Sequence, residues 1–152
     1  MYGFVLTAHS WLRWAVLVAG FGATMAALTD RPVVGEDSRV DRWGLALVTM
    51  VDFQMLLGLL LYLVVSPMMA AIRQDFTLAM HDRSTRFWAV EHVSLMLGVV
   101  VLVHLGRVLA RKAAKAVTKR RRLLVCFGLA TLLMLAGTPW PGTAVGRPLF
   151  RF

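Results

Sequence analysis

The sequence is poor in charged residues and has a single cysteine. Of its 152 residues, 16% are charged and 59% are hydrophobic, whereas soluble domains carry about a quarter charged residues. The lone Cys126 excludes an internal disulfide, and the lack of a CxxCH sequence excludes covalent attachment of a c-type haem. No P-loop, nucleophile elbow or zinc-ligand spacing is found. This composition predicts a membrane protein rather than a soluble domain.

Four apolar runs are candidates for membrane spans, since about 20 helical residues cross roughly 30 Å of hydrocarbon. They cover about 3–28, 44–66, 87–110 and 123–138. The first run has no basic segment before it and is too long for a signal-peptide core, so we expect a retained helix. The sequence therefore predicts one domain, an all-α integral membrane four-helix bundle of up-down-up-down topology.

The connections between these runs differ in character. Residues 29–43 form a polar linker, and residues 139–152 form an irregular tail rich in proline and glycine. The connection 67–86 is half apolar and half charged, which is typical of short helices lying in the membrane interface.

The formal net charge of +9 comes largely from one loop, residues 111–122, which contains no acidic residue. A basic loop between two apolar spans is a topogenic signal and attracts anionic lipid headgroups. We therefore expect lipid rather than nucleic acid as its partner. Placing this loop in the cytoplasm leaves both termini and the 67–86 connection outside.

Two histidines in the predicted spans are candidate metal ligands. Ionisable side chains in hydrocarbon cost several kcal/mol unless they are paired, solvated or coordinated. His9 and His92 lie at similar depth on the first and third runs, which are diagonal in such a bundle. Two imidazoles facing one another supply both axial ligands of a b-type haem iron. The alternative is that both histidines hydrogen-bond within the protein or at its boundary.

Arg13 and Glu91 accompany these histidines. Arg13 follows His9 by four residues and therefore shares its helix face. We expect it to contact Glu91 or a haem propionate. Glu91 precedes His92 and is a candidate to orient His9 or to carry protons. The alternative is an Arg13–Glu91 ion pair that only joins the two helices.

A second polar group is predicted at the other end of the spans. His104 lies about 18 Å along the helix from His92, at the depth of Asp52 and Gln54 on the second run. We expect His104 to hydrogen-bond to one of them. The group is either a proton or quinone-headgroup site or a structural set of buried hydrogen bonds.

Five sequence segments carry a family resemblance: HSWLRW in the first run, DFQMLLGLLLY in the second, RFWAVEH and HLGR at the two ends of the third, and PWP after the fourth. In this order they resemble small bacterial four-helix membrane proteins of about 150 residues labelled cytochrome b-like. The resemblance covers nearly the whole chain. It implies a bacterial cytoplasmic membrane protein and marks the following positions for testing: His9, Arg13, Asp52, Gln54, Glu91, His92 and His104.

These features lead to two functional expectations. The first is a b-type cytochrome-like protein that binds haem between the first and third helices and transfers electrons, with quinone as a candidate partner. The second is an accessory subunit without cofactor in a larger respiratory or photosynthetic membrane complex. A proton-coupled transporter or channel is less favoured, because the helices show no broken segments. No motif identifies a substrate or an enzymatic reaction.

Overall fold

The computed structural model describes residues 1–32 and 38–151, and every regular element in these ranges is helical. Four helices are long: α1 (Tyr2–Thr29), α2 (Arg39–Leu60), α6 (His92–Arg111) and α7 (Ala116–Gly137). The predicted linker 29–43 is shorter than expected, because α2 begins at Arg39. Residues 33–37 of that linker and the last residue of the tail lie outside the described residues.

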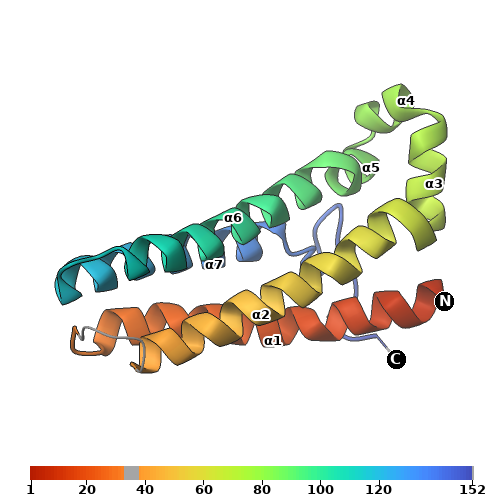
Figure 1. The fold of residues 1–152 in the computed structure, drawn as a ribbon. Coiled ribbons are helices and arrows are strands. Elements are labelled where there is room, and N and C mark those ends of the chain that lie inside the picture. Colours follow the sequence, from red (N-terminus) through yellow and green to blue (C-terminus); the bar gives the residue numbers. More distant parts are fainter. Residues whose placement is uncertain (33–37, 152) are drawn as a thin grey trace.

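Short helical segments connect α2 to α6 and lie beyond the ends of the long helices (Figure 1). Three of them begin at a side-chain cap: Ser66 accepts from the Met69 amide, Asp75 from Leu78 and Asp82 from Thr85, whereas the two π-helical turns continue directly into the long helices. The segments are η1 (Leu61–Val65), α3 (Pro67–Gln74), α4 (Phe76–His81), α5 (Arg83–Arg86) and η2 (Phe87–Glu91). The expectation of short helices in this connection is therefore confirmed.

Within the described ranges, three helical stretches are long and apolar enough to cross a membrane: Tyr2–Thr29, Arg39–Val65 and Arg83–Arg111. Helix α7 is not among them because Arg120, Arg121 and Arg122 stand in its first turns. Its apolar part, residues 123–137, extends only about 22 Å at 1.5 Å per residue. The fourth predicted span therefore stays a prediction.

The core lies where α1 contacts α2 and α7, and where α6 contacts α7 and α2. The α1 face is built from alanines, including Ala23 and Ala27, which are fully buried. Small residues let helix backbones approach closely. Phe127 and Leu47 are fully buried beside them and fill the centre of the core.

The basic end of the molecule is tied together by cations of α7. Arg120 donates to the carbonyls of Ala27 (2.9 Å) and Leu28 (2.9 Å), and Arg122 donates to the carbonyl of Leu109 (2.6 Å). The last carbonyls of a helix lack intrahelical partners, so cations near them are stabilising. Most of the predicted loop 111–122 is helical, because α7 begins at Ala116. Two of its cations bind carbonyls of neighbouring helices instead of facing outward only.

The C-terminal tail folds back along α1 (Figure 1). Trp14 Nε1 donates to the Leu149 carbonyl at 3.1 Å, and Trp11 Nε1 donates to the Arg151 carbonyl at 2.8 Å. The Phe150 ring lies 5.3 Å from Trp11 and 5.6 Å from Trp14, measured between ring centroids. The tail is irregular as predicted, yet aromatic contacts hold it against the first helix.

Candidate functional site

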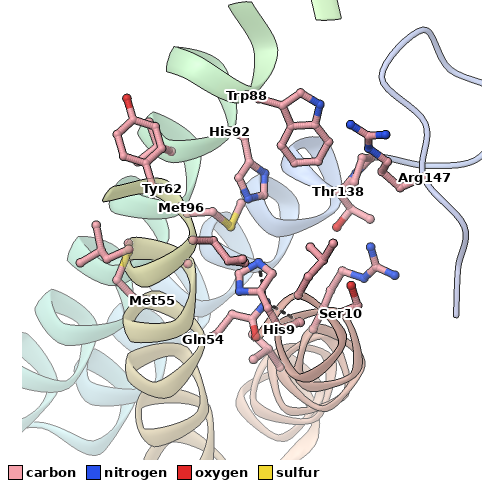
Figure 2. A pocket seen from close by; sticks show the side chains of 18 of the residues that line it. His9, Ser10, Gln54, Met55, Tyr62, Trp88, His92, Met96, Thr138 and Arg147 are labelled. Carbon is pink, nitrogen blue, oxygen red and sulfur yellow. Dashed lines mark hydrogen bonds between the residues drawn. The ribbon is translucent and has the colours of Figure 1, made fainter. Parts of the chain in front are cut away.

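A cavity of about 350 Å³ lies where the start of α1, the end of α2, the start of α6 and the end of α7 meet the tail. This volume is within the range of small-molecule sites, about 300–1,000 Å³. Its walls are mainly aliphatic and thioether side chains, among them Val51, Met55, Val93 and Met96. Figure 2 shows His9 and His92 projecting into this space from α1 and α6. Both histidines therefore line one cavity, and their role as a pair of ligands stays a prediction.

His92 is held in one orientation. Its Nδ1 lies 2.8 Å from the carbonyl oxygen of Gly137. A carbonyl only accepts hydrogen bonds, so Nδ1 carries the proton, and in the neutral ring Nε2 keeps its lone pair. The rings of Phe87 and Trp88 pack beside it, with centroids 5.8 Å and 5.4 Å away. A histidine fixed through one nitrogen with the other free is the usual arrangement of a metal ligand.

Two π-helical turns lie beside His92. The Tyr62 hydroxyl in η1 donates to the Ala89 carbonyl in η2 at 2.7 Å and so joins the two turns. Such turns inside longer helices occur frequently at functional sites, because they shift the side chains that follow. Here they set the ends of α2 and α6 around the cavity.

His9 is held by Gln54 rather than by Glu91. The Gln54 amide nitrogen donates to the His9 carbonyl at 3.0 Å and lies 3.2 Å from His9 Nε2. A Cβ added at Gly58 would lie 3.2 Å from His9 Cε1, so the missing side chain makes room for the ring. Gln54 thus belongs to the histidine cavity and not, as predicted, to a group with Asp52 and His104.

Unsatisfied polar atoms are concentrated at this cavity. Among the described residues, four buried side-chain atoms have no hydrogen-bond partner: His9 Nδ1, Arg13 Nε, Gln54 Oε1 and Trp88 Nε1. All four residues line the cavity. Buried polar groups in proteins are nearly always hydrogen-bonded, and each exception calls for an explanation. A bound molecule that carries polar groups is an explanation that fits all four atoms.

The predicted contacts of Glu91 are wrong. Glu91 accepts from Arg86 Nε at 3.0 Å, and both side chains are 45% exposed. It is not among the residues that line the cavity. Arg13 instead donates to the Leu149 carbonyl at 2.9 Å. The reason is angular: Glu91 is one residue from His92, which turns it about 100° away on the helix.

Asp52 and His104 form the predicted contact, with Asp52 Oδ1 3.3 Å from His104 Nε2. Their side chains are 47% and 42% exposed. Neither residue lines the cavity. This pair therefore lies on the outer surface of α2 and α6.

Several lining residues were not foreseen from the sequence, namely Trp88, Thr138, Arg147 and Arg151. Trp88 follows Phe87 in the segment RFWAVEH, so helical geometry could have predicted its position near His92. The tail residues carry no periodicity, and only the run GRPLFRF of arginines and aromatics hinted at a docked segment.

No protein-family model matches the chain, and neither a curated protein nor a solved structure matches it. The resemblance to cytochrome b-like proteins therefore stays a prediction.

Proposed function

We propose that the chain is an integral membrane protein of the bacterial cytoplasmic membrane, folded as an up-down-up-down four-helix bundle. Its three long apolar helices support this proposal. Helix α7 completes the bundle with its arginines at the boundary, where long basic side chains reach polar surroundings. Lys112, Lys115 and Arg121 are exposed at that end and face anionic headgroups on the cytoplasmic side. Both termini then lie outside.

We further propose that the histidine cavity binds haem b and serves electron transfer, with quinone as the exchange partner. The observation that carries this is His92, whose Nδ1 proton is held by Gly137 while Nε2 is left for a ligand. The donor set fits: two imidazoles, apolar walls, and Arg13 beside them for a propionate. Bound haem supplies an iron that accepts and releases single electrons.

The surrounding residues have distinct parts in this proposal. The Gly137 carbonyl orients the His92 ring and increases the basicity of its Nε2 by accepting the hydrogen bond from Nδ1–H. Phe87 and Trp88 pack against the same ring and exclude water. His9, whose ring lies beside Gly58 and is hydrogen-bonded by Gln54, would hold the group through its second nitrogen.

A reduced-minus-oxidised absorption spectrum of the protein purified from haem-sufficient cells tests this proposal. We expect a Soret band and a b-type α-band that disappear in His92→Ala and shift or weaken in His9→Ala. His104→Ala is the matched control, since His104 is on the same helix but outside the cavity lining. A wild-type protein without a Soret band would contradict the proposal.

One observation favours the second function, an accessory subunit or homo-oligomer. The Asp52–His104 pair is about half exposed on a face that also exposes Leu56 and Val101. In hydrocarbon such a pair costs several kcal/mol unless another polypeptide covers it. Size-exclusion chromatography with light scattering in mild detergent tests this. We expect an assembly larger than one chain that dissociates in D52L/H104L, whereas a wild-type monomer would count against it.

A further inference from the structure

The side chains in the cavity lining that carry a formal charge are all arginines, with the histidines counted as neutral. Arg13, Arg147 and Arg151 line it, and among the described residues no aspartate or glutamate does. Elsewhere in the described chain some cations are paired with acids, as in Arg86–Glu91 and Lys119–Asp41. Like charges that share one lining repel one another, and burial strengthens the repulsion at Arg13, whose Nε is buried. Arg13 donates to the Leu149 carbonyl, but its buried Nε has no hydrogen-bond partner among the described residues, and this favours an anionic ligand.

The tail holds the arginines in place. Arg13 and Trp14 both donate to the Leu149 carbonyl, at 2.9 Å and 3.1 Å. Trp11 donates to the Arg151 carbonyl at 2.8 Å. These bonds place the segment between Arg147 and Arg151 directly beside Arg13 on α1.

Two of the guanidinium groups are oriented by aromatic faces. The Cζ atom of Arg147 lies 5.3 Å from the ring centroid of Trp88, and that of Arg13 lies 5.1 Å from Trp14. Stacking of this kind fixes the plane of a guanidinium and leaves its edge free to donate. Figure 2 shows Arg147 next to Trp88, on the same side of the cavity as His92. Arg13 Nε is itself buried and without a partner.

The arginine side of the cavity reaches the surface of the protein. Arg147 and Pro148 are exposed although both line the cavity, so the tail borders its opening. Inside lie apolar side chains such as Leu17, Val51 and Val99. A molecule that fits both parts has an apolar body and an anionic group at one end.

We propose that Arg13, Arg147 and Arg151 form a carboxylate-binding site at the opening, which selects amphipathic ligands whose apolar body fills the cavity. Planar carboxylates match the forked donors of arginine and form paired, charge-assisted hydrogen bonds. A haem propionate and a fatty-acid carboxylate present the same group. The inference rests on the proposed function in one respect, that the cavity binds a ligand, but its test needs no iron.

The test compares acids with their neutral esters on the haem-depleted full chain in a non-ionic detergent. Quenching of tryptophan fluorescence is titrated with protoporphyrin IX and its dimethyl ester, and with palmitate and methyl palmitate. We expect at least one acid to bind about tenfold more tightly than its ester, since hydrogen bonds to a charged group are stronger than those to a neutral one. Preference for the porphyrin acid identifies a propionate site, and preference for palmitate identifies a lipid site.

Arginine variants make the test specific. R147Q/R151Q should remove the preference for the acid and leave ester binding unchanged. Arg83→Gln, an exposed arginine of α5 outside the lining, is the control and should bind as the wild type does. Equal binding of acid and ester by the wild type, or an undiminished preference in R147Q/R151Q, would overturn the inference. Absence of a Soret band with acid preference intact would refute haem binding alone.

Discussion

The contact between α6 and α7 depends on Gly106. A Cβ built at this position would lie 2.7 Å from the Cβ of Cys126, whereas carbon atoms in contact are about 3.5–4.0 Å apart. Both Cβ atoms are fixed to their backbones, so Gly106→Ala forces the helices apart by about 1 Å. Overpacking of this kind costs about 1–3 kcal/mol, against a gain in helix propensity of at most about 1 kcal/mol. We expect a net loss of stability.

Gly128→Ala is the matched control, because its Cβ would meet only Thr24 Cγ2 at an ordinary 3.9 Å. It gains helix propensity without a clash. Thermal unfolding in detergent, followed by circular dichroism, should show Gly106→Ala melting a few degrees below the wild type, since about 1 kcal/mol shifts Tm by about 2–4 °C at this size. In a Cys126→Gly background the same substitution should no longer destabilise. A melting temperature of Gly106→Ala at or above that of the wild type would refute the close-contact argument.

Two further predictions concern the ends of the helices. Arg120→Gln removes charge-assisted bonds to the last carbonyls of α1 and should lower the free energy of unfolding by about 1.5–3 kcal/mol, whereas the exposed Arg121→Gln should change it by less than about 0.5 kcal/mol in the same denaturation assay. Hydrogen bonds from the Thr85 amide and hydroxyl lower the pKa of Asp82 below its usual value. The cap is therefore fully present above that usual value and is lost as pH falls through the lowered pKa, so hydrogen exchange at the Thr85 amide should be faster in Asp82→Ala at neutral pH and equal to the wild type in strong acid.

The long helices and the meeting of His9 with His92 could be predicted from the sequence. Apolar runs of sufficient length determine where helices form in such a chain. Alternating helix directions then bring residue 9 of the first helix and the start of the third to the same end. Depth along a helix follows from counting residues, so the shared depth of the two histidines was accessible without a structure.

Rotation about each helix axis was harder to predict. Asp52 and Gln54 are two residues apart, hence about 200° apart around α2. They cannot face the same neighbour, yet their similar depth placed them in one predicted group. The structure directs Gln54 to His9 and Asp52 outward to His104. Which of the two faces inward depends on tertiary packing, which the apolar pattern of a helix surrounded by lipid does not encode.

The tail could not be placed by either argument. Residues 139–151 have no helical or strand period, and their position comes from three donors on α1, namely Trp11, Arg13 and Trp14. From the sequence alone, these three residues could equally be anchors at the membrane interface or contacts for the tail. The place of Arg147 and Arg151 in the cavity lining therefore depends on the position of the tail, which the sequence does not predict.

The two ends of the molecule use their cations differently, and this difference argues for a site. At the end where α1 terminates, Arg120 and Arg122 satisfy carbonyls and Lys119 is 2.7 Å from Asp41. Those charges have a structural role that the fold itself explains. At the other end Arg13 also donates to a carbonyl, that of Leu149, but its Nε and buried atoms of His9 and Trp88 have no hydrogen-bond partner among the described residues. A chain that satisfies its polar groups at one end and leaves them open around a cavity at the other leaves the second set for a ligand.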